Sequence, residues 1–292
     1  MIMIKLQSFR LLFTATCLTC VNVATQSSPT RAATITANNN ATVLVNTLLG
    51  SNSGITVSNA IFTGNANAGG TFTGAQADNL GIDNGIILSS GNVASAAGVN
   101  SSPSTTTVFG TPGDATLNSS FSTSTQDAAV LSFDFTTTTG NIFFNYVFGS
   151  EEYPEFVGSR FNDVFGFFVD GKNIALIPST TTPIAINNVN AGANSSFFRN
   201  NNNGTSGPIN LQYDGFTTVL TAQALGLSSG THTLKLAIAD VGDSQLDSGV
   251  FLQGGSLTVT PPSTAVPEPF TIVGTLIGAT VAFRTRQRLK AT

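Results

Sequence analysis

The sequence has few charged residues and few of the residue types that carry most enzyme chemistry. Charged residues make up 9% of the 292 residues, tryptophan is absent, and His232 is the single histidine. Both cysteines, Cys17 and Cys20, lie in the first apolar stretch, so a chain processed after that stretch contains none. A disulfide framework, a cysteine-ligated zinc site and a cysteine nucleophile are therefore not expected in the processed protein.

Basic residues are also scarce in the middle of the chain. Residues 34–266 contain 14 of the 15 acidic residues but only four basic ones, Arg160, Lys172, Arg199 and Lys235, which gives this region a net charge of −10. Nucleic acid is excluded as a partner, because affinity for phosphates rests on neutralisation by basic side chains. An acidic body is compatible with cations or neutral sugars.

The first 33 residues have the pattern of a secretory signal peptide. Lys5 and Arg10 form a basic start, and an apolar stretch runs from Leu11 to about Ala24. Ala24 and Ala33 are both candidate cleavage points. The alternative, a retained N-terminal membrane helix, is disfavoured because the apolar run is short and interrupted by polar residues. We therefore expect an exported protein.

The body, residues 34–260, is expected to be a single all-β domain with one short N-terminal helix. Apolar residues at helical spacing predict that helix over residues 41–50, where Gly50 ends it. Gly, Asn, Asp and Pro separate the predicted strands. These strands are 55–63, 85–90, 128–136, 141–148, 163–170, 173–177, 183–187, 215–222, 231–239 and 250–259.

This number of strands, with almost no helical periodicity, predicts an antiparallel β-sandwich of the jelly-roll type. With 22 phenylalanines and 41% hydrophobic residues, the chain has enough apolar side chains for one large core.

Acidic side chains gather at the ends of two pairs of predicted core strands. Three glutamates fall within five residues, and carboxylates this close repel one another unless a positive charge lies among them. Carboxylate and amide oxygens are the ligands that Ca²⁺ prefers, and calcium is abundant outside cells. We therefore predict a structural calcium site, with solvated or capping acids in turns as the alternative. The candidate ligands are Glu151, Glu152, Glu155, Asn162, Asp163, Asp214, Asp240, Asp243 and Asp247.

Several motifs of the body resemble those of the choice-of-anchor L domain family. The motifs lie at residues 85–91, 148–157, 161–168, 213–217, 238–243 and 247–251, in the order that the family has them. The resemblance covers roughly residues 41–260. It implies an exported bacterial domain that different proteins carry on different C-terminal anchors, and it implies no particular molecular activity.

The C-terminal part of the chain resembles a PEP-CTERM sorting signal. A linker at residues 261–266 precedes Pro267, Glu268 and Pro269, and the signal as a whole covers residues 267–292. An uncharged stretch, 270–283, and a basic cluster, 284–290, follow the motif. The resemblance implies processing by an exosortase-type membrane transpeptidase after transient anchoring by a short transmembrane helix. The alternative is an ordinary tail anchor.

The sequence therefore favours a non-enzymatic structural or adhesive protein of the cell surface or the surrounding exopolysaccharide. The alternative is a carbohydrate-binding or glycoside-hydrolysing module, for which Glu152 and Asp240 are the candidate pair of carboxyl groups. The absence of tryptophan, which commonly stacks on sugars, and of any motif of a known hydrolase disfavours that alternative. Without a Gly-x-Ser-x-Gly motif, a serine nucleophile with a catalytic triad is not supported either.

Overall fold

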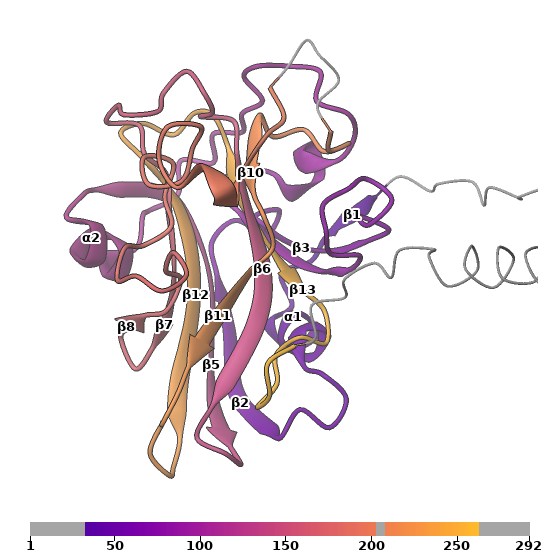
Figure 1. Ribbon diagram of the computed structural model, residues 1–292, viewed down its shortest axis with the longest axis vertical. Helices are drawn as coiled ribbons and strands as arrows, with labels where there is room; N and C mark the ends of the chain where they lie inside the picture. The colour runs from indigo at the N-terminus through magenta and orange to yellow at the C-terminus, as the bar shows by residue number, and fades with distance from the viewer. Residues whose placement is uncertain (1–32, 203–207, 263–292) are drawn as a thin grey trace, which may run out of the picture. The chain divides into compact units, whose positions relative to one another are not determined.

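The computed structural model describes residues 33–202 and 208–262, which form two antiparallel sheets with short helices (Figure 1). The all-β prediction is confirmed. The predicted signal peptide and the sorting signal with its transmembrane helix lie outside these residues, apart from Ala33 at the edge of the former. No helix in the described part of the chain is long and apolar enough to cross a membrane.

The larger sheet has eight strands in the order β1-β3-β4-β13-β6-β10-β9, with β11 also paired to β6. Its strands are β1 (Thr34–Ala37), β3 (Gly69–Thr73), β4 (Gly85–Ser89), β6 (Ile142–Ser150), β9 (Phe198–Asn200), β10 (Gly215–Thr217), β11 (Leu220–Ala224) and β13 (Ser248–Gln253). The smaller sheet has the order β2-β5-β12-β7-β8. Its strands are β2 (Ile55–Thr63), β5 (Thr125–Thr137), β7 (Val164–Val169), β8 (Lys172–Asn173) and β12 (His232–Val241).

The pairing of the central strands is that of a jelly roll. In the larger sheet β4, β13, β6 and β11 are neighbours in that order, and in the smaller sheet β5, β12, β7 and β8 follow one another. Along the chain, β4, β5, β6 and β7 lie alternately in the larger and the smaller sheet. This is the double Greek-key arrangement that the sequence predicts.

Four short helices complete the described part of the fold. They are α1 (Ala41–Leu48), α2 (Ala115–Phe121) and the 3-10 helices η1 (Val93–Ala96) and η2 (Ser195–Phe197). The side chain of Asn40 caps α1 by accepting a hydrogen bond from the Val43 amide. The helix ends at Leu48, two residues before the predicted end, and its buried residues join the main core.

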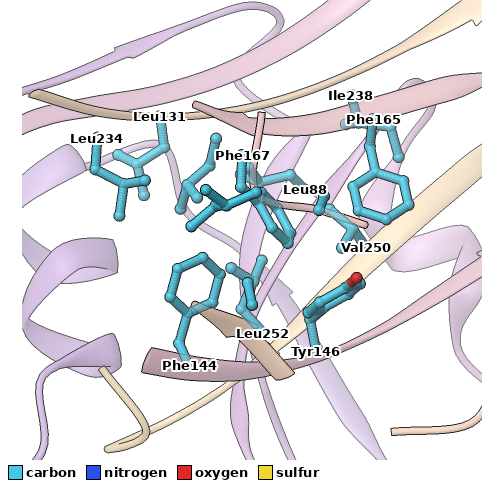
Figure 2. Packing of buried hydrophobic residues seen from close by; sticks show 14 of the residues in the cluster. Leu88, Leu131, Phe144, Tyr146, Phe165, Phe167, Leu234, Ile238, Val250 and Leu252 are labelled. Atoms are coloured by element: carbon cyan, nitrogen blue, oxygen red, sulfur yellow. The ribbon is translucent and has the colours of Figure 1, made fainter. Parts of the chain in front are cut away.

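The main core lies between the two sheets and is rich in aromatic rings (Figure 2). Phe167 of β7 packs against Phe144 and Tyr146 of β6, with ring centroids 5.1 and 4.9 Å apart. Every residue of β6 and β7 is buried, because smaller apolar clusters also cover the outer faces of both sheets. This double burial explains why these strands read as nearly continuous apolar runs.

Four predicted strands differ clearly from the observed ones. The strand predicted at 250–259 ends at Gln253 as β13. The segment predicted as one strand at 215–222 is divided into β10 and β11, which pair with different parts of β6. The predicted strand at 173–177 is reduced to the two residues of β8, and 183–187 forms only isolated bridges. The loop after β7 turns back on itself, since Ile177 and Ile184 donate backbone hydrogen bonds to Thr182 and Ala175.

Candidate functional site: a buried acidic cluster

The pairing of the central strands brings acidic residues from distant parts of the sequence to one end of the sandwich. Ser150, the last residue of β6, pairs with Ser248 of β13 and with Gly215 of β10. Glu151 therefore follows Ser150 at the same level as Asp247 and Asp214, which precede those partners. The Glu151 amide donates a hydrogen bond of 3.1 Å to the Asp247 carbonyl.

The smaller sheet adds carboxyl groups at the same end. Ala239 of β12 pairs with Val164 of β7, so Asp240 and Asp163 lie next to the paired residues. Asp240 itself pairs with Gln126 of β5, and this places Asp127 nearby. The seven buried carboxyl residues at this end are called the acidic cluster below. They are Asp127, Glu151, Glu152, Asp163, Asp214, Asp240 and Asp247.

All seven side chains are shielded from water, with exposed fractions between 0% and 2%. Carboxylates are almost never buried in this way without a positive partner. The ion pairs seen among the described residues include His232 with Asp170 and Lys235 with Asp114, and neither pair includes Glu151, Glu152, Asp240 or Asp247. The nearby Arg160 is exposed and lies over the ring of Phe161.

Some members of the cluster are held by hydrogen bonds. Asp163 accepts from the Val241 amide at 2.9 Å and from the Ser248 hydroxyl at 2.7 Å. Asp127 accepts from the amides of Phe109 and Thr111. These two carboxyl groups have clear structural roles, because each ties a loop to a strand end.

Other oxygens of the cluster are buried without a hydrogen-bond partner. They are both carboxyl oxygens of Glu151, both of Asp240, Oε2 of Glu152 and Oδ2 of Asp247. Thr105 lies beside Glu151 and Ser90 beside Asp240, where each lowers the pKa of the carboxyl group, but neither contact has hydrogen-bond geometry. A buried acceptor without a partner is unfavourable by about 1–3 kcal/mol, and by more when it is charged.

Burial and mutual repulsion change the protonation of these groups. Loss of hydration, followed by repulsion from Asp214, raises the pKa of Glu151 to about 9. Burial and the charge of Asp163 likewise raise the pKa of Glu152 to about 9. Burial raises the pKa of Asp247 to about 7 and that of Asp240 well above its ordinary value. Ionising the cluster is therefore unfavourable in the absence of a counter-charge.

The carboxyl groups are neighbours, but their oxygens do not converge on one point. Across the described ranges, no group of three or more Asp, Glu, His or Cys side chains is arranged to hold a metal ion. A metal ion would therefore require side chains of the cluster to rotate inward. Asp247 has little room on one side, since a Cβ at Gly91 would lie 1.8 Å from its Oδ2.

One side of the cluster opens to the surface through a cavity of about 300 Å³. Glu152 lies at its inner wall and the half-buried Asp243 at its rim. The remaining wall is formed by Pro103, Ser104, Phe156, Phe161, Gln245 and Leu246. Glu152 is thus a member of the cluster that lines this cavity.

The nine sequence-predicted ligands have different surroundings. Glu151, Glu152, Asp163, Asp214, Asp240 and Asp247 lie in the cluster, and Asp243 lies at the cavity rim. Glu155 is exposed, and Asn162 is engaged in its loop, where its Oδ1 accepts from the Asn187 amide at 2.9 Å.

Asp127 belongs to the cluster but was not among the predicted ligands. It directly precedes the predicted strand 128–136, so the sequence marks it only as an acid at a strand end. That signal is shared by several exposed acids.

The acidic cluster predicts an unusual pH dependence for the metal-free protein. Glu151 and Glu152 have an ordinary pKa of 4.5 and a folded-state pKa of about 9, so the folded state binds more protons between these values. Stability is then fully present below about pH 4.5 and is lost as the pH rises toward about 9. Each kcal/mol lost lowers Tm by roughly 2–4 °C in a domain of this size.

Calorimetry in EDTA across this range tests the prediction. Glu152→Gln should flatten the dependence, whereas Glu155→Gln, which changes an exposed side chain in the same loop, should leave it unchanged. A Tm that rises with pH would contradict the assignment.

A protein-family model matches nearly all of the β-sandwich domain. The model of the choice-of-anchor L domain matches residues 32–258, which include both sheets and the acidic cluster. No curated protein and no solved structure shows a significant match. Because the match covers most of the sequence, the chain belongs to the choice-of-anchor L domain family of exported, surface-associated proteins.

Proposed function

We propose that this protein is a non-enzymatic structural or adhesive domain of the cell surface, whose acidic cluster binds calcium. The observation that carries the proposal is the set of buried carboxyl oxygens without hydrogen-bond partners or a basic neighbour. Two events relieve such a cluster, protonation or the binding of a cation. At neutral pH outside the cell, a cation does so without proton uptake.

Calcium suits this donor set better than other common metals. Ca²⁺ takes six to eight oxygen ligands in flexible geometry, and the cluster offers carboxyl oxygens. The acidic cluster offers oxygen ligands and no cysteine or histidine, so transition metals that prefer sulfur or nitrogen ligands are less well matched. Glu151, Asp240 and Asp247 have the buried oxygens without partners and are the proposed main ligands. Glu152, at the cavity, has another such oxygen.

Calcium at this position would tie together the ends of strands from both sheets. Glu151 follows β6, Asp240 lies near the end of β12, and Asp247 precedes β13. Their mutual repulsion would become attraction to a shared ion. The domain would then be rigid in calcium-containing surroundings, as suits a structural component outside the cell.

Catalysis receives less support from the same residues. Glu152 and Asp240 are the candidate glycosidase pair, but of the two only Glu152 lines the cavity, and both side chains are 1% exposed. A substrate that reached Glu152 would therefore not meet Asp240. We propose exopolysaccharide as a neighbour in the extracellular matrix, without a cleavage reaction.

We further propose that an exosortase-type transpeptidase processes the C-terminal signal at residues 267–292. The support is the sequence order of Pro267, Glu268 and Pro269, an uncharged stretch and a basic cluster. Positive charges after an apolar stretch hold that end on the cytoplasmic side, so the chain would be anchored until it is cut.

The calcium proposal predicts opposite effects of one substitution with and without the ion. In EDTA at mildly alkaline pH, Glu151→Gln should stabilise the protein by about 1–3 kcal/mol, because a buried group that repels its neighbours becomes neutral. In calcium the same variant should lose most of the increase in Tm that the wild type shows, because a ligand is missing. Differential scanning calorimetry measures both effects.

Glu155→Gln is the matched control, since Glu155 is exposed in the same loop. It should behave as the wild type in both buffers. A wild-type Tm that is equal in calcium and in EDTA would remove the proposal.

The sorting proposal predicts a shortened mature protein. Cells should be fractionated and the mass of the surface-associated form determined. The mature C-terminus is expected at or next to Pro267–Pro269, and substitution of Glu268 by Ala should leave the tail attached. A surface form that still ends at Thr292 would contradict exosortase processing.

A further inference from the structure

Glu151 and Glu152 are consecutive in sequence, but they face different sets of carboxyl groups. The charged neighbours of Glu151 are Asp214 and Asp247, whereas those of Glu152 are Asp163 and Asp243. The two sets share no residue. Both residues lie in the turn that directly follows β6, and there their side chains meet different neighbours, although Asp163 of the second set is also repelled by Asp247 of the first.

The two sets also differ in their access to solvent. Glu151, Asp214 and Asp247 are at most 2% exposed, and none of them lines the cavity. Glu152 and Asp243 both line it. An ion on the first side would be enclosed by protein, while an ion on the second side would face water.

Glu152 provides the observation that points to a ligand in the cavity. Its side chain is 1% exposed, and its Oε2 has no hydrogen-bond partner. Asp243 stands at the rim and uses its Oδ1 to accept from the Gln245 amide at 3.0 Å. Asp163 is not counted as a ligand, because both of its oxygens already accept hydrogen bonds. Its charge adds to the repulsion that Glu152 experiences.

We propose that Glu152 and Asp243 hold a second, exchangeable divalent cation at the mouth of this cavity, separate from the enclosed ion. This inference rests on the calcium-binding function proposed above and adds a distinct position to it. The two carboxyl groups supply only part of the six to eight oxygens that calcium takes. Water fills the remaining positions, and a cavity of about 300 Å³ has room for several molecules at about 30 Å³ each.

The position of the carboxyl groups supports two ions over one. One divalent ion balances only two charges, and Glu152 and Asp243 line a cavity that neither Glu151 nor Asp247 lines. A single ion near Glu151 would leave the pair at the cavity uncompensated. A second ion at the cavity mouth relieves that pair.

Terbium luminescence on the full-length protein tests the proposal, because Tb³⁺ replaces Ca²⁺ and its emission lifetime in H₂O and D₂O gives the number of bound waters. The wild type is expected to bind two equivalents with two lifetimes, one from an ion with few waters and one from an ion with several. Asp243→Asn should remove the hydrated component and leave the other. Glu155→Gln should change neither.

Because Asp243 is half-buried at a rim, its substitution is not expected to prevent folding, and circular dichroism with and without calcium checks this. One equivalent with a single lifetime in the wild type would overturn the second site while leaving the proposed function intact. Loss of both components in a folded Asp243→Asn variant would overturn it as well. No terbium binding and no stabilisation by calcium would instead overturn the proposed function itself.

Discussion

Electrostatic repulsion among buried carboxyl groups is the constraint on which this account of the molecule depends. Seven acidic side chains lie at one end of the sandwich with almost no exposure, and several of their carboxyl oxygens are buried without a hydrogen-bond partner. Such groups are stable only when they are protonated or when a cation lies among them. The raised pKa values and the need for a counter-ion are two consequences of the same burial.

The rest of the fold keeps these side chains in place. The aromatic core between the sheets fixes β6 against β7, and the pairing of Ser150 with Ser248 and Gly215 sets the level at which the acids stand. A shift of one residue in this register would turn the carboxyl groups toward the other face of the sheet. The apolar core therefore provides the free energy that offsets a locally unfavourable arrangement, as functional sites commonly require.

Much of the fold could be predicted because the central strands carry strong local signals. The predicted strand at 55–63 coincides with β2, and those at 141–148 and 163–170 match β6 and β7 to within two residues at each end. The strand β3 was missed because its sequence, Gly-Gly-Thr-Phe-Thr, begins with two residues of low strand propensity. The helix α2 was missed because its Thr, Asn and Ser residues are weak helix formers, and the Asp114 cap signal stood alone.

The site was predictable only as a list of acids at strand ends. Sequence alone does not distinguish Glu151, which is fully buried, from Glu155, which lies four residues further on and is exposed. The difference arises from tertiary pairing, because Glu151 immediately follows a strand that pairs on both sides whereas Glu155 lies in the turn beyond. The different surroundings of Glu151 and Glu152 arise in the turn that follows β6, and composition does not reveal them.

The most direct test of the central idea is the metal content of the purified protein. The protein should be prepared in calcium, passed into metal-free buffer at neutral pH, and analysed by inductively coupled plasma mass spectrometry. The account predicts that at least one calcium ion per chain is retained and that excess EDTA removes it. Calcium at background level in the folded protein before EDTA treatment would contradict the account.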